Sequence, residues 1–142
     1  MSTRTGFVAG VALTAPALWV GGWAELAPRS FYDSFPGFGR VWVSTDGPFN
    51  EHLVRDVGGL YLALAAAGLL ALAWRDRRTL LLLGTSWLVF GLLHVGYHVA
   101  HLDTLASTAD RVGEVVSLGI VPVLAVVLLL AERTDPGPVP PT

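Results

Sequence analysis

Three of the four histidines in the chain, His94, His98 and His101, lie in the sequence HVGYHVAH. Residues four and seven positions apart share one face of an α-helix, so we expect the three imidazoles on the same face. Imidazole nitrogens bind metal ions and haem iron, and they change charge near neutral pH. The spacing therefore suits a metal or haem ligand set, a proton-handling site or a polar contact inside a helical bundle.

A second group of polar residues, in the sequence NEHLVRD, comes directly before an apolar run. Glu51 lies four residues before Arg55, so the two side chains can pair across one helical turn. The same spacing separates His52 from Asp56. Together with Glu114, at the start of a later apolar run, these residues are the candidate partners of the histidines.

The apolar runs that carry these residues have the length of membrane-spanning helices. Only 14% of the 142 residues are charged, against about 25% in ordinary soluble domains, and the mean hydropathy is +0.59. A membrane helix needs about 20 mostly apolar residues. Four runs reach or approach that length: Gly6–Ala24, Val57–Trp74, Leu80–Ala100 and Val115–Ala131. The sequence predicts an all-α polytopic membrane protein, a four-helix bundle in a single domain at 1–134, with a disordered proline-rich tail at 135–142.

The arginines set the expected orientation. The densest positive cluster, RDRR at 75–78, separates the second run from the third, and cytoplasmic loops carry such an excess of positive charge. This predicts that both termini are cytoplasmic and that the segment between the first two helices lies outside. Arginine without lysine, beside abundant alanine, glycine, leucine and valine, favours a bacterial source and hence the bacterial inner membrane. The first run is too long for a typical signal peptide and lacks a clear cleavage site, which favours an uncleaved helix.

The segment 28–49, expected on the outer side, is rich in aromatic residues: Phe31, Tyr32, Phe35, Phe38, Trp42 and Phe49. Aromatic rings suit the headgroup region of a membrane, where the ring is buried and polar edges stay hydrated. Two interpretations follow. The segment anchors the protein at the membrane surface, or it forms a lid over an outward-facing pocket.

The predicted topology brings all the candidate polar residues to the outer ends of their helices. In a structural network, Arg55 would bond to Glu51 or Glu114, and the histidines would bond to carboxylates or backbone carbonyls. In a metal site, His94 and His98 would share one ion, completed by His52 or a glutamate.

Two further interpretations involve the same imidazoles. His52 and a histidine of the third run would be the two axial ligands of a b-type haem. Alternatively, the histidines would respond to acidity near the outer surface.

The expected role is that of a non-enzymatic or accessory membrane component with a buried polar cluster on its outer side. The expected partners are the lipid bilayer and a further membrane protein or a second copy of the chain. No basic tract suits nucleic acid, and the absence of cysteine excludes disulfides, thiolate-bound metals and c-type haem. The alternative role is a metal- or haem-binding membrane protein that uses His52 and the three histidines of the third run.

The sequence Asn50-Glu51, followed by Arg55 and the glycine pair Gly58-Gly59, resembles the DoxX-like superfamily of small four-helix bacterial membrane proteins. That superfamily has an Asn-Glu-x-Arg element before paired glycines, and the gap before Arg55 is longer here. The likeness covers the second run well and the rest only by hydropathy. It implies a compact four-helix bundle, often an accessory subunit, with no established catalytic set. The histidine face of the third run is not a motif of that superfamily.

Overall fold

Four long helices make up most of the chain. The computed structural model describes residues 3–133, with the long helices α1 (Thr3–Leu26), α3 (Glu51–Trp74), α4 (Arg77–Ala100) and α5 (Thr108–Arg133). The connections contain the short helix α2 (Pro28–Ser34), an antiparallel hairpin of β1 (Pro36–Gly37) and β2 (Arg40–Val41), and the 3-10 helix η1 (Leu102–Thr104). The predicted all-α bundle of four apolar helices, with an aromatic-rich connection between the first two, is confirmed. The disordered tail expected at 135–142 lies outside the described residues.

Side-chain caps fix where the helices begin. The Asn50 side chain accepts a hydrogen bond from the amide of Leu53 at 3.3 Å and so caps α3. Asp76 caps α4 in the same way, and the hydroxyl and amide of Thr79 both donate to its carboxylate. Because these hydrogen bonds favour the ionised carboxylate, they hold the pKa of Asp76 below its usual value. Between the two helices, Arg75 ends α3 in the left-handed conformation with φ 55°.

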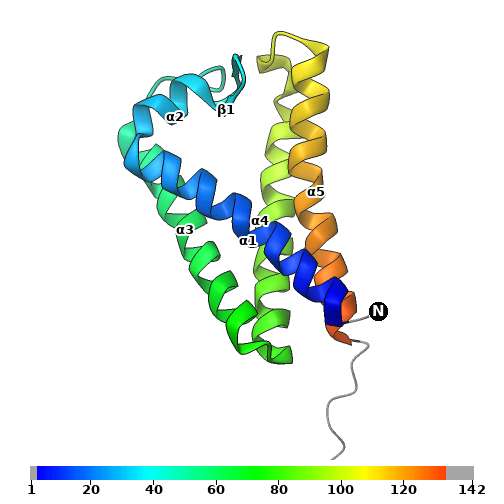
Figure 1. Ribbon diagram of the computed structural model, residues 1–142. Coiled ribbons are helices and arrows are strands. Elements are labelled where there is room, and N and C mark those ends of the chain that lie inside the picture. Colours follow the sequence, from blue (N-terminus) through cyan, green and yellow to red (C-terminus); the bar gives the residue numbers. More distant parts are fainter. Residues whose placement is uncertain (1–2, 134–142) are drawn as a thin grey trace, which may run out of the picture.

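The long helices pack mainly as two pairs, α1 with α3 and α4 with α5, and α1 also packs across α5 (Figure 1). Close to the turn between α3 and α4, the two pairs meet in a buried core made of Ala9, Leu13, Ala17, Ala65, Ala71, Leu80, Leu83, Trp87, Ala125 and Leu128. Within the α1–α3 pair, a Cβ added at Gly58 would lie 2.7 Å from the backbone nitrogen of Glu25. The helices therefore approach as closely as small residues allow.

The two pairs separate toward the end where α1 and α4 finish and α3 and α5 begin (Figure 1). We call this end the α2 end. Residues 27–50, named the aromatic cap, fold across it and form a second small core in which Ala24, Phe31 and Val54 are buried. The Tyr32 hydroxyl donates to the carbonyl oxygen of Gly47 at 2.5 Å and so joins the start of the cap to its end.

Large apolar side chains also cover the outside of the bundle. Exposed examples occur on each long helix: Val8, Leu82, Leu93, Val116 and Leu69. Each long helix contains a stretch of 23 or 24 residues that is long and apolar enough to cross a membrane. An apolar exterior of this kind suits contact with lipid chains rather than water. The fold is that of a multi-pass membrane protein.

Candidate functional site

A cavity of about 420 Å³ lies at the α2 end, between the α1–α3 pair and the α4–α5 pair and beneath the aromatic cap. Cavities of this size hold small molecules or cofactors in other proteins. The wall that α1 and α3 provide is mostly apolar and consists of Val20, Leu53, Val54, Val57 and Tyr61. Other side chains do not cover this wall completely, since Leu53 is 58% exposed and Val57 is 40% exposed. The cavity therefore presents free apolar surface.

The aromatic cap provides the roof of the cavity. Phe31, Tyr32, Phe35 and Trp42 all line it, and the rings of Phe31 and Phe35 contact each other with centroids 4.8 Å apart. Phe38 differs from these residues, because it lies at the tip of the hairpin and is fully exposed. The cap thus covers a cavity with most of its rings and presents one ring to the surroundings.

A polar wall faces this apolar surface from α4 and α5. His94, His98 and Glu114 line the cavity there, and Nδ1 of His98 lies 3.0 Å from Oε1 of Glu114. The Glu114 residue is only 4% exposed, so the contact with His98 compensates a carboxylate that is removed from water. The ring of His94 stacks on Phe90, with an angle of 17° between the planes, and its centroid is 4.7 Å from that of His98. These three side chains form a continuous polar strip.

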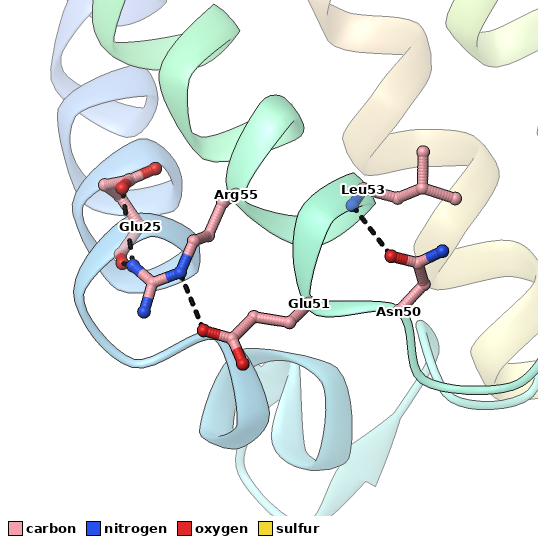
Figure 2. Close-up of polar contacts among 5 residues, drawn as sticks. All are labelled: Glu25, Asn50, Glu51, Leu53 and Arg55. Atoms are coloured by element: carbon pink, nitrogen blue, oxygen red, sulfur yellow. Dashed lines mark hydrogen bonds and ion pairs between the residues drawn. The ribbon is translucent and has the colours of Figure 1, made fainter.

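Arg55 belongs to a separate cluster at the same end of the bundle (Figure 2). Its Nε donates to Oε1 of Glu51 at 2.9 Å, and its Nη1 donates to the backbone carbonyl of Glu25 and lies 3.4 Å from the Glu25 carboxylate. These contacts join the last turn of α1 to the first turn of α3. None of the three residues lines the cavity. The sequence-based pairing of Arg55 with Glu51 is present, whereas the alternative pairing with Glu114 is wrong because Glu114 bonds to His98.

The two remaining predicted histidines lie outside the cavity. His52 and Asp56 form the expected pair, with 3.4 Å between Nε2 and Oδ2, but the His52 side chain is 83% exposed. His101 follows the last residue of α4, and its ring stacks on Tyr97 while Nδ1 lies 2.8 Å from the Tyr97 carbonyl oxygen. His101 therefore does not join His94 and His98 at the cavity, and it lies directly after the last residue of α4.

The predicted metal and haem ligand sets do not come together in the described part of the chain. Among residues 3–133, no group of three or more His, Asp or Glu side chains is placed to hold a metal ion. For a b-type haem, His52 would have to face His94 or His98 across the cavity, and it does not line the cavity. Of the predicted site residues, only His94, His98 and Glu114 line the cavity.

Contacts that the sequence did not indicate hold the cap over the cavity. Trp42 Nε1 donates to Oδ1 of Asp110 at 3.0 Å, and Arg40 pairs with the same carboxylate. Asp110 also forms the N-terminal cap of α5 with Ser107, whose hydroxyl accepts a hydrogen bond from the Asp110 amide at 3.0 Å. Arg40 and Asp110 are 70 residues apart in sequence, so no local spacing could have paired them.

Asp46, in the aromatic cap, is a further residue that the sequence did not single out. It lines the cavity, as does Tyr97 of α4. The cap is joined to α5 through Asp110. Comparison of the chain with protein-family models, with curated proteins and with solved structures found no match.

Proposed function

We propose that this protein is a non-enzymatic, accessory component of the bacterial inner membrane that binds a small, largely apolar ligand beneath its aromatic cap. The observation that carries the proposal is the cavity of about 420 Å³ with its apolar wall, aromatic roof and short polar strip. Small-molecule sites are typically concave and apolar, with a few polar groups that orient the ligand. The cavity has this composition.

The proposed orientation places the aromatic cap outside the cell and both termini in the cytoplasm. The arginines of the α3–α4 turn support it, because they lie at the end of the bundle opposite the cap. The native chain has no cysteine, so single cysteines at Phe38 and Arg78 can report exposure to an impermeant maleimide. We expect labelling of Phe38→Cys in intact cells and of Arg78→Cys only after permeabilisation, and the reverse pattern would overturn the orientation.

The proposed relationship to the DoxX-like superfamily is supported by the residues around the start of α3. Asn50 caps this helix, Glu51 and Arg55 join it to α1, and Gly58 permits the close contact with α1. Gly59, the second residue of the glycine pair, has no neighbour within 4 Å of an added Cβ. This element has a structural role in the bundle, which agrees with an accessory protein that lacks a catalytic set.

Ligand binding can be tested with the neutral fluorescent probe N-phenyl-1-naphthylamine on protein in dodecyl maltoside. A bulkier side chain at Val57 should fill part of the cavity, and Val57→Phe should weaken probe binding about tenfold. Leu60→Phe is the matched control, because Leu60 lies on the same helix, is 47% exposed and does not line the cavity. Equal probe binding by the wild type and both variants would contradict the proposal.

A further inference from the structure

The formal charges that line the cavity are carboxylates. Asp46 and Glu114 both line it, and no arginine among the described residues does. The arginines around this end of the bundle have carboxylate partners elsewhere: Arg29 pairs with Asp33, Arg40 with Asp110, and Arg55 with Glu51 and Glu25. The cavity therefore has acidic groups without a matching set of fixed cations.

The histidines neutralise only part of this charge. Asp46 and Glu114 line the same cavity, so the two carboxylates belong to one site. His98 contacts Glu114 directly, and its ring centroid is 4.7 Å from that of His94. Two positive charges at that separation would repel each other strongly away from bulk water, which disfavours a charge on both imidazoles. His98 pairs with Glu114, whereas Asp46 has no ion-pair partner among the described residues, so one carboxylate at the cavity is left uncompensated.

The aromatic lining favours cations in a second, independent way. Aromatic faces attract positive charge, and quaternary ammonium groups are commonly held by several rings. Tyr32, Phe35 and Trp42 provide such rings from the roof, and Tyr61 and Tyr97 provide them from the walls. Rings of the cap already hold one cation, because the guanidinium of Arg29 lies 5.0 Å from the centroid of Phe49 and 5.7 Å from that of Tyr32.

We propose that the ligand of this cavity is an organic cation with apolar substituents, such as a quaternary ammonium group. The rings of the cap surround the apolar substituents, and Asp46 and Glu114 compensate the positive charge. This proposal rests on the proposed function, because it specifies the ligand of the same cavity. The cation is either a free hydrophobic ammonium compound or the headgroup of a membrane lipid, since both have the same chemistry.

The test is isothermal titration of benzyltrimethylammonium into protein in dodecyl maltoside, beside phenylmethanesulfonate, an anion of similar size and shape. We expect the cation to bind at least about tenfold more tightly than the anion. Glu114→Gln and Asp46→Asn should each weaken cation binding by about tenfold. Glu51→Gln is the matched control, because Glu51 is a carboxylate at the same end that does not line the cavity, and it should leave binding unchanged.

Asp46→Asn keeps the test valid if the buried Glu114→Gln substitution prevents folding, because Asp46 is exposed in the cap. Equal binding of cation and anion, or undiminished cation binding by Asp46→Asn, would overturn the proposal. If the neutral naphthylamine probe binds and the cation does not, the cation proposal fails and the proposed function stands. If none of the probes binds, both fail. Added phosphatidylcholine that competes with benzyltrimethylammonium would identify a lipid headgroup, and no competition would identify a free cation.

Discussion

The two ends of the helical bundle differ in how the same four helices meet. Toward the α3–α4 turn, residues such as Leu128 and Ala65 are fully buried and Trp87 is 2% exposed. At the α2 end the helix pairs separate, a cavity remains between them, and Leu53 keeps 58% of its surface exposed. The packed end therefore holds the helices together, whereas the open end leaves apolar and charged side chains available to a ligand.

The largest effect on stability should come from the packed end. Trp87→Ala removes a buried side chain that contacts the rings of Tyr61 and Phe90, and it should lower the free energy of unfolding by about 3 kcal/mol. Trp74→Ala is the matched control, because Trp74 is 63% exposed at the end of α3. Unfolding in mixed micelles of increasing SDS content measures both. Similar losses for the two variants would remove the distinction between a packed core and the rest of the bundle.

A smaller effect on stability should distinguish the contact of His98 with Glu114 from the contacts of Arg55, both at the open end. His98→Leu leaves Glu114 buried without its partner and should cost roughly 2–3 kcal/mol of stability, whereas Arg55→Ala should cost clearly less because its contacts are half exposed. The same unfolding assay applies. In the double variant His98→Leu/Glu114→Leu, most of the loss should disappear because no buried charge remains. An Arg55→Ala loss that exceeds the His98→Leu loss would reverse this ranking.

The smallest expected effect on stability is that of Asp76, which caps α4 at the packed end and whose contribution depends on pH. The folded state holds the pKa of Asp76 below its unfolded value, so the cap of α4 adds stability above the unfolded pKa of about 4. This stability is lost as the pH falls through the folded pKa. Asp76→Asn should therefore have a lower Tm than the wild type at pH 7, and the two should converge on acidification. A difference in Tm that persists at the acid end would contradict the assignment.

The apolar runs of the sequence predicted the membrane-spanning part of each helix, and residue spacing predicted the polar turn before the second. The second apolar run was expected from Val57, with Glu51 and Arg55 on a helical turn before it, and α3 begins at Glu51 with Asn50 as its cap. The third run ended correctly at Ala100. Hydropathy detects the part of a helix that lies in the apolar layer, and it does not detect the polar turns beyond that layer.

For the site, contacts within one helix could be predicted from residue spacing, whereas contacts between helices could not. The pairs of Glu51 with Arg55 and of His52 with Asp56 could be predicted, because residues four apart meet on one helix. The contact of His98 with Glu114 depends on how α4 packs against α5, and periodicity does not determine that packing. His101 lies directly after Ala100, the last residue of α4, and it does not line the cavity with His94 and His98.

Asp110 has two roles at once, since it completes the cap of α5 and receives Arg40 and Trp42 from the aromatic cap. Glu114 lies one helical turn further along α5. If the aromatic cap moved away, Asp110 would lose Arg40 and Trp42 as partners. Asp110 helps to fix the first turn of α5, and Glu114 follows that turn. On the proposed function, a ligand that contacts both Glu114 and the aromatic cap would favour closure of the cap, and reciprocity requires that closure favours binding to the same extent. A ligand bound at Glu114 should slow hydrogen exchange in the hairpin of the cap, although it never touches Asp110.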